Sequence, residues 1–353
     1  MILYSQKGIR INGYEEDTFC IAKHENLNGI DISSFTGDEI FYEIDNTCVI
    51  LYDALTKTIF DINQYYELRP LEPIWYSECG IDSESGSSKD FFDRCVQASV
   101  NGSEQTDEIG KILASSSSIF HPVSRYIYLY DLHALLGYIQ NNIISMKQNV
   151  EDFYILLGEY TDVNMPYIDT AEDNYYFTSG GKCVKLFNSL SAIIITMNSV
   201  FDLISKLTFE VGNIPDSFGN KVHKFKCNNT TFVYGRNDRI FGDMNIEGTI
   251  FETDKNIKLV TELRNELIHN SSWQSINKLY VHYKQNEIVE KYILIPDFDE
   301  TGTIIRSGNR NHFFAQENRI NEMLPEILED IMKRIHKTLC NLMSKAENIS
   351  VKQ

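Results

Sequence analysis

The sequence lacks the patterns that mark several common classes of protein. It has seven cysteines but no C-x-x-C pair, which argues against a structural zinc site and favours reduced, mostly buried thiols. Its first residues, MILYSQKGIR, show no basic-then-apolar signal layout. No run approaches the roughly 20 apolar residues that a membrane span needs. We therefore expect a cytoplasmic protein without a membrane segment.

Motifs for cofactors and metals are missing as well. No G-x-G-x-x-G occurs, and TSGGKC at 178–183 lacks the spacing of a phosphate-binding P-loop, so we interpret it as the flexible start of a helix. Five of the eight histidines form no helix-spaced pair of metal ligands. These five are His121, His133, His223, His282 and His312. The sequence predicts neither a cofactor nor a metal.

Positive charge is also scarce, and the shortage is uneven. The net charge of the 353 residues is −18, of which −13 falls in residues 1–120. The remainder is close to balance and has local basic clusters, which we interpret as solvated surface. These clusters are KVHKFK at 221–226, RSGNRNH at 306–312 and KRIHK at 333–337. An acidic segment repels phosphates, so residues 1–120 are expected to regulate the rest of the chain or simply to aid solubility.

Residues 1–120 are predicted to form a smaller β-rich domain. Four short segments alternate between apolar and polar residues and are bounded by Gly, Asn or Asp, as β-strands are. They are DTFCIA, EIFYEI, TCVILYD and KTIFDI. One or two short helices are expected within 88–116. A domain boundary is predicted near residue 120, with FHPV as the connector.

Residues 121–353 have a helical rhythm. Apolar residues recur at steps of three and four over 131–160 and 182–207, and a shorter helix is predicted over 254–270. A final helix, with Pro325 in its first turn or at a kink, is predicted to run to about residue 346. Four helices with one apolar face each predict a four-helix bundle, and the chain as a whole is predicted to be α+β. Strand- and turn-rich insertions are expected at 211–253 and 274–318. The main stripes are Leu132, Leu135, Ile139, Ile143, Met146, Val150, Phe153 and Leu157; Phe187, Leu190, Ile194, Met197, Phe201 and Ile204; and Leu324, Ile327, Leu328, Ile331, Ile335, Leu339 and Leu342.

The short helix, within LVTELRNELIHNSSW at 259–273, carries the most informative residues. Arg264 falls inside an apolar arc, while Asn265 and His269, four residues apart, share a neighbouring face. A guanidinium cannot be left dry and unpaired, so this arc must meet something polar or anionic. The plain structural interpretation is a snorkelling arginine and a histidine that caps the helix end. The arc is formed by Ile257, Leu259, Val260, Leu263, Leu267 and Ile268.

The segment LRNELIHN resembles the signature of the HEPN superfamily (higher eukaryotes and prokaryotes nucleotide-binding). Members are small helical bundles with an arginine, four to six residues, and then a histidine, often with a polar residue directly after the arginine. Arg264, Asn265 and His269 match these three positions. The predicted place of the segment, near the end of the third of four helices, matches the family as well. The resemblance covers about 130–346, and residues 1–120 lie outside it.

The resemblance implies a function. Many active members are metal-independent endoribonucleases that work as dimers, and some are toxins or anti-phage defence effectors. The implied catalytic residues are Arg264, Asn265 and His269, the products are a 2′,3′-cyclic phosphate and a 5′-hydroxyl, and the implied partners are RNA, a second copy of the chain and an antitoxin or regulatory protein. Imidazole suits removal of the 2′-hydroxyl proton, and a guanidinium suits the charge of the phosphorane.

Three observations keep alternatives open. On a regular helix Arg264 and His269 point about 140° apart, so fraying of the helix end or pairing of two motif helices is needed to bring them together. Ser271 stands where members controlled by adenylylation carry a tyrosine, which argues against that control. A non-catalytic RNA- or protein-binding module of the same fold is the main alternative.

YILIPDFDETGTI at 292–304 also resembles the first motif of haloacid-dehalogenase-type phosphatases, with a plain acidic turn as the competing interpretation.

Overall fold

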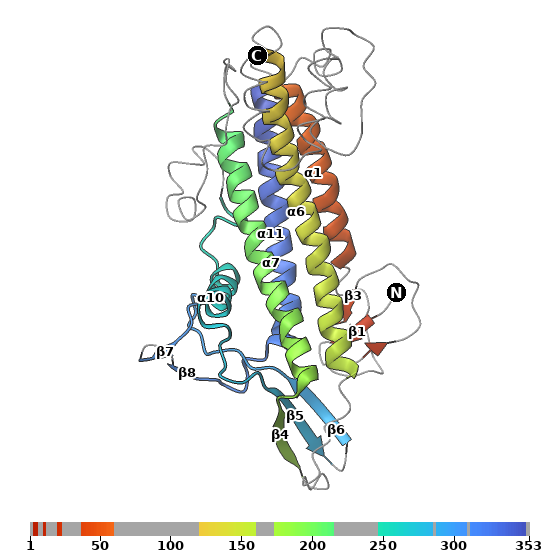
Figure 1. Ribbon diagram of the computed structural model, residues 1–353, viewed down its shortest axis with the longest axis vertical. Helices are drawn as coiled ribbons and strands as arrows, with labels where there is room; N and C mark the ends of the chain where they lie inside the picture. The colour runs from red at the N-terminus through yellow and green to blue at the C-terminus, as the bar shows by residue number, and fades with distance from the viewer. Residues whose placement is uncertain are drawn as a thin grey trace, which may run out of the picture. The chain divides into compact units, whose positions relative to one another are not determined.

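The chain has a mixed α+β fold of long helices and small sheets (Figure 1). The computed structural model describes residues 3–5, 10–11, 20–22, 37–59, 120–159, 173–214, 246–284, 287–308 and 311–350. The described helices are α1 (Gly37–Ile59), α6 (Phe120–Glu159), α7 (Gly181–Gly212), α10 (Lys255–Asn270) and α11 (Ile320–Ser350). The described strands are β1 (Leu3–Ser5), β2 (Arg10–Ile11), β3 (Cys20–Ala22), β4 (Asn174–Thr178), β5 (Leu279–Lys284), β6 (Glu287–Tyr292), β7 (Arg306–Ser307) and β8 (Asn311–His312).

Three small sheets are formed by strands that are mostly antiparallel. Strands β2, β1 and β3 form one sheet, in which β1 pairs antiparallel with β2 and parallel with β3. Strands β4, β5 and β6 form an antiparallel sheet in that order, and β7 and β8 form a hairpin. Only two residues separate the end of β4 from the start of α7, so this sheet is joined directly to the start of that helix.

The chain divides into two compact units, and each is made from several segments of the sequence. The first unit comprises Met1–Thr47, Tyr138–Ile204 and Met244–Leu339. The second comprises Cys48–Gly137, Ser205–Asp243 and Cys340–Gln353. The first unit therefore contains α10 and the sheet of β4, β5 and β6.

Helix α10 is fixed in the first unit by contacts with α7 and α11. The side chain of Asn198 on α7 donates to the carbonyl of Val260, at 3.3 Å. Asn256 near the start of α10 donates to the carboxylate of Asp330 on α11, at 3.0 Å. Apolar side chains bury the same side of α10, since Leu259 and Leu263 are almost fully inaccessible. The first three turns of the motif helix are thus packed against the rest of the unit.

A cluster around Arg334 holds the start of α10. Its guanidinium, on α11, contacts the carboxylates of Glu252, Asp254 and Asp330 at 2.7–3.0 Å. Asp254 is also the N-cap residue of α10 and accepts hydrogen bonds from the first free backbone amides, which stabilises the helix end. Gly302, at a φ of +85°, lets a turn approach the same helical turn, where any Cβ would lie 2.1 Å from the carbonyl oxygen of Lys255.

The second unit contains a buried polar pair. Tyr128 on α6 donates a hydrogen bond to Glu210 on α7 at 3.0 Å, and both residues are inaccessible to solvent. Burial, followed by the charge of Glu210, raises the pKa of Tyr128 well above its usual value. One helical turn from Tyr128, burial also raises the pKa of Asp131 to about 6. This unit therefore holds acidic groups that are costly to ionise.

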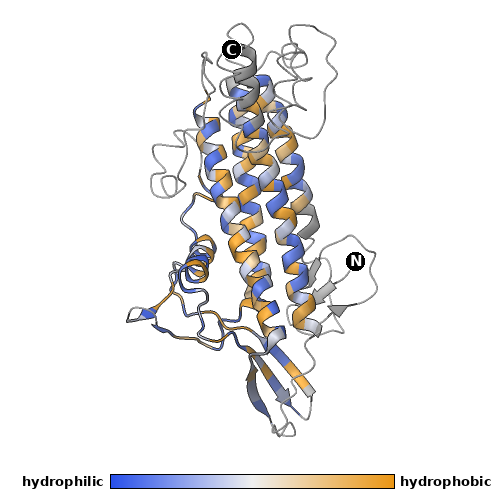
Figure 2. Ribbon diagram, viewed as in Figure 1, coloured by the Kyte–Doolittle hydropathy of each residue, from blue (hydrophilic) through white to orange (hydrophobic). Residues whose placement is uncertain are grey.

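The helices predicted for residues 121–353 are confirmed as elements, and the predicted stripes are buried. Every stripe residue on α6, α7 and α11 named in the sequence analysis belongs to the core. Figure 2 shows that the long helices carry both apolar and hydrophilic residues along their length, as helices with one buried stripe do. Helix α6 begins at Phe120, earlier than expected, so FHPV is its first turn and not a connector. The free thiols of Cys48 and Cys183 are buried, as predicted.

The prediction of strands across residues 37–59 is wrong, because this segment is the helix α1. Its Ile, Tyr, Phe, Val and Thr residues favour strands by propensity. The buried residues nevertheless recur at helical steps of three and four, and this spacing decides the structure. They are Ile44, Cys48, Leu51, Leu55 and Ile59. The strand predicted at DTFCIA is found in part as β3, while the helices predicted in 88–116 and most of the insertion at 211–253 lie outside the described residues.

Helix α7 departs from one further expectation. By length and composition alone it is apolar enough to cross a bilayer, and it is the one such helix among the described residues. Half of its most apolar window is buried inside the structure, and the core helix of a helical bundle meets the same criteria. The helix is therefore only weak evidence of a membrane segment.

Candidate functional site

The motif residues lie on the last two turns of α10, which stays regular to its end. The helix continues through Asn270, and Ser271 ends it in the left-handed conformation at a φ of 67°. This C-cap is the usual way to terminate a helix, although glycine is the commoner residue there. Fraying of the helix end, which would have brought Arg264 and His269 together, is therefore not seen.

The three predicted site residues are partly brought together. Arg264 Nη1 donates a hydrogen bond to Asn265 Oδ1 at 3.1 Å. Asn265 lies about 40° from His269 around the helix axis, and residues four apart are neighbours on a helix surface. The Arg264 guanidinium is thus turned toward the face that carries His269. His269 itself is exposed, so a ligand can reach its ring.

The apolar arc of α10 is narrower than the sequence predicts. Ile257, Leu259, Val260 and Leu263 are buried, but the Ile268 side chain is 50% exposed and Leu267 is only partly buried. By direction, Arg264 still lies between Val260 and Ile257, which are both buried, as the sequence predicts. Only the C-terminal end of the arc differs, because no side chain fully covers Ile268 in the last turn.

Arg264 differs in its partners from three other arginines of this unit whose side chains the structure describes. Arg306, Arg319 and Arg334 each contact two or three carboxylates, which neutralise their charge. Within the described part of the chain, Arg264 contacts no carboxylate and donates to a neutral amide. An unneutralised guanidinium beside an exposed histidine can attract an anion such as a phosphate.

A buried carboxylate lies within the same motif. The Glu266 side chain is only 5% exposed and accepts from Arg306 at 2.8 Å, from Asn270 at 2.8 Å and from the ring of His312 at 3.2 Å. Burial by itself raises the pKa of Glu266, but these hydrogen bonds, that of Arg306 first, outweigh burial and hold its pKa below the usual value. Glu266 therefore ties the β7–β8 hairpin to α10.

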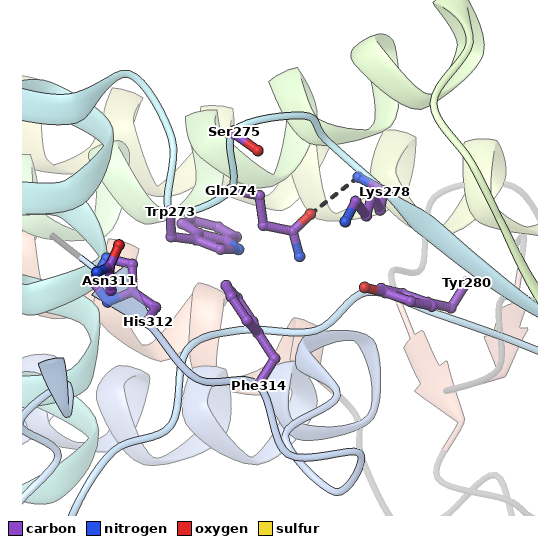
Figure 3. A pocket seen from close by; sticks show the side chains of 8 residues that line it. All are labelled: Trp273, Gln274, Ser275, Lys278, Tyr280, Asn311, His312 and Phe314. Carbon is purple, nitrogen blue, oxygen red and sulfur yellow. Dashed lines mark hydrogen bonds between the residues drawn. The ribbon is translucent and has the colours of Figure 1, made fainter. Parts of the chain in front are cut away.

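His312 belongs to the wall of a pocket beside α10 (Figure 3). Its side chain is 6% exposed, and Nε2 faces Glu266. Its Nδ1 is one of two buried side-chain nitrogens without a hydrogen-bond partner among the described residues. The pocket has a volume of about 260 Å³. It is lined by Trp273, Gln274, Ser275, Lys278, Tyr280, Asn311, His312 and Phe314.

Comparison with known proteins gives no match: no family model, curated protein or solved structure is significantly similar to this chain.

The acidic segment that resembles a phosphatase motif has a structural role. Asp297 accepts from the backbone of Ala315 and the side chain of Asn318, and Asp299 accepts from Thr301 and Thr303 within its own turn. Both carboxylates are thus used to hold loops, as the competing interpretation of an acidic turn predicted. Across the described ranges, no three His, Cys, Asp or Glu side chains are grouped to hold a metal ion.

Sequence reasoning missed Glu266, Arg306 and His312. Glu266 could have been found, because its position on α10 borders the buried side and a buried acid needs partners. Its partners could not have been found, because RSGNRNH at 306–312 has the composition of a solvated loop and nothing in its spacing connects it to α10. The pocket likewise joins residues separated by about 40 positions in the sequence.

Proposed function

We propose that this chain is a metal-independent endoribonuclease of the HEPN type. The observation that carries the proposal is the state of Arg264, whose guanidinium has no carboxylate partner among the described residues and leans toward the face of His269. Buried or paired arginines serve structure, whereas an arginine without a counter-charge beside an accessible histidine suits a phosphate ligand. The proposed site consists of Arg264, Asn265 and His269.

The proposed reaction is an intramolecular transesterification. His269 takes the proton of a ribose 2′-hydroxyl, and the 2′-oxygen forms a bond to the adjacent phosphorus. Arg264 neutralises the charge that develops on the phosphoryl oxygens. The bond from phosphorus to the 5′-oxygen breaks, that oxygen takes a proton from water, and His269 returns the proton it removed to the solvent. The products are a 2′,3′-cyclic phosphate and a 5′-hydroxyl, and no metal or cofactor takes part.

The proposed enzyme is a homodimer. Within one chain, Arg264 and His269 still point about 140° apart on a regular helix, so one copy of α10 presents them poorly to one phosphate. Two motif helices related by a two-fold axis place Arg264 of one copy near His269 of the other. The exposed Ile268 beside Arg264 supplies apolar surface for such a contact. We further propose that the protein is a cytoplasmic toxin or anti-phage defence effector that is inhibited by an antitoxin or regulatory protein.

Cleavage of RNA in the presence of EDTA tests the proposal. His269→Ala is expected to lower the cleavage rate by about two or more orders of magnitude without loss of stability, because the residue is exposed near a helix end. His336→Ala is the matched control, since His336 is a partly exposed histidine on α11 near Glu43. Equal cleavage rates for the parent and His269→Ala would show that His269 takes no part in catalysis.

The angular separation of Arg264 and His269 favours one alternative, a non-catalytic module that binds RNA or a protein. The same assay separates the two functions. RNA binding without cleavage, in a chain that is folded and dimeric, would support the module and contradict the nuclease.

A further inference from the structure

The pocket beside α10 has flat aromatic walls. Trp273, Tyr280 and Phe314 contribute three rings to its lining (Figure 3). Two of them are held in place, because Trp273 Nε1 donates to the carbonyl of Leu294 at 3.1 Å and Tyr280 stacks on Tyr292 with ring centroids 5.4 Å apart. The volume of about 260 Å³ is just below the roughly 300–1,000 Å³ of sites for drug-sized ligands. A single planar ring system fits these dimensions.

The remaining lining residues present hydrogen-bonding groups at the edges of these walls. The Gln274 amide is used internally, since it donates to the Leu294 carbonyl and accepts from the backbone of Lys278. Ser275 and Asn311 are exposed at the pocket. The side chain of Lys278 also lines it. Aromatic walls with mixed donors and acceptors suit a nucleobase better than an aliphatic or purely anionic ligand.

His312 connects this pocket to the motif helix. The carboxylate of Glu266 accepts from Nε2 when the ring is neutral, so Nδ1 is left as an acceptor without a partner. Nδ1 is buried, although other atoms of His312 line the pocket. Glu266 precedes His269 by three residues, and residues three apart are neighbours on a helix. A ligand in the pocket therefore lies close to the proposed catalytic face.

The aromatic surface continues from the pocket onto the sheet of β4, β5 and β6. Phe177 pairs directly with Tyr280 and Tyr175 with His282, so these side chains share one face. The Tyr175 and Phe177 side chains are 52% and 48% exposed. The ammonium of Lys278 lies 4.9 Å from the ring centroid of Phe177. Exposed aromatic rings accompanied by cations are the usual stacking surface for single-stranded nucleic acid.

We propose that the pocket binds one nucleobase of a single-stranded RNA, with the adjacent base stacked on the Tyr175 and Phe177 surface. This inference rests on the proposed function, because it names the part of the site that selects the substrate. Base stacking and edge contacts are how proteins recognise unpaired RNA, whereas a paired base cannot enter a pocket. The pocket thus selects unpaired segments and places the next phosphate near His269.

Tryptophan fluorescence reports occupancy of the pocket directly. The chain has two tryptophans, so Trp75→Phe leaves Trp273 in the pocket wall as the single fluorophore. The probes are the four ribonucleoside monophosphates and an uncleavable 2′-O-methyl oligonucleotide. We expect saturable quenching, and we expect the oligonucleotide to bind more tightly than any monophosphate because it also covers the Tyr175 and Phe177 surface.

Two variants and one control test whether the ligand binds in this pocket. Phe314→Ala removes an aromatic wall and is expected to weaken binding about tenfold, the effect of losing one stacking side chain. Ser275→Tyr fills the pocket from an exposed position and is expected to abolish quenching. Phe313→Ala is the matched control, because Phe313 is 56% exposed and does not line the pocket. Thermal unfolding of each variant confirms that it is folded.

Each outcome supports or contradicts the binding of a nucleobase in the pocket. Binding that is weakened about tenfold in Phe314→Ala, abolished in Ser275→Tyr and unchanged in Phe313→Ala supports the pocket. Absence of saturable quenching, or equal binding by all variants, overturns it. A monophosphate that binds as tightly as the oligonucleotide overturns the RNA assignment in favour of a free nucleotide. Intact oligonucleotide binding without any RNA cleavage keeps the pocket and rejects the nuclease, so the two proposals fail separately.

Discussion

Glu266→Gln tests whether the buried carboxylate holds the site together. The substitution keeps the size of the side chain but removes the charge that three donors share, on Arg306, Asn270 and His312. Hydrogen bonds to a charged group contribute about 1.5–3 kcal/mol, and neutral ones about 0.5–1.5 kcal/mol. The difference over three bonds is about 3 kcal/mol. Arg306 is partly exposed and retains its ion pair with Glu262, which reduces the effect of the substitution. We therefore expect a loss of about 2–3 kcal/mol in the free energy of unfolding.

Urea unfolding at pH 7 measures this loss, with Glu262→Gln as the control. Glu262 contacts the same Arg306 and also the exposed Lys258, so its loss is expected to cost less than about 1 kcal/mol. The pKa of Glu266 is lowered by folding, so its stabilisation is present above the unfolded-state value of 4.5 and is lost as the pH falls through the folded-state pKa. The difference between parent and Glu266→Gln should therefore narrow below about pH 4.5. Equal stability at pH 7, or a difference that stays constant down to pH 3, would refute the reasoning.

Two further predictions concern the second unit and the assembly. Burial raises the pKa of Asp131 from 3.8 to about 6, so stability from this group is present below pH 3.8 and is lost as the pH rises through 6. Asp131→Asn should accordingly stabilise the chain by about 1–2 kcal/mol at pH 8, allowing for partial exposure, and not at pH 4, which thermal unfolding would show. If two chains share each site, a mixture of Arg264→Ala and His269→Ala should regain up to about a quarter of the parent activity, because heterodimers hold one intact pair. A mixture as inactive as its components, with subunit exchange demonstrated, would place the whole site within one chain.

The positions of helices could be predicted from the sequence wherever the buried residues form a single stripe along the helix. On α6, α7 and α11 the predicted stripes are the buried residues, because the spacing of apolar side chains decides which face packs. On α1 the same spacing is present, but its β-branched and aromatic residues favour strands by propensity and led to the wrong prediction. The correct rule was periodicity, since Ile44, Cys48 and Leu51 repeat at helical steps.

The candidate site could be predicted only where its residues are close in sequence. Arg264, Asn265 and His269 share one helix, so their spacing fixes their relative directions. Two of the three partners of Glu266, Arg306 and His312, come from a hairpin about 40 residues later, and no local sequence pattern predicts that contact. Tertiary packing also determines which side chains are exposed. The helical spacing of apolar residues places Ile268 on the buried face, yet no neighbouring segment covers it fully.

The chemistry of the product ends tests the central claim most directly. The measurement is the mass of fragments released from a defined RNA in EDTA by the parent and by His269→Ala, together with the same RNA carrying a single 2′-deoxynucleotide at the cleaved position. We predict that the parent yields fragments ending in a 2′,3′-cyclic phosphate and beginning with a 5′-hydroxyl, that the 2′-deoxy substitution blocks the cut, and that His269→Ala yields about 100-fold less product. Fragments with a 5′-phosphate, or equal yields from parent and variant, would contradict the account.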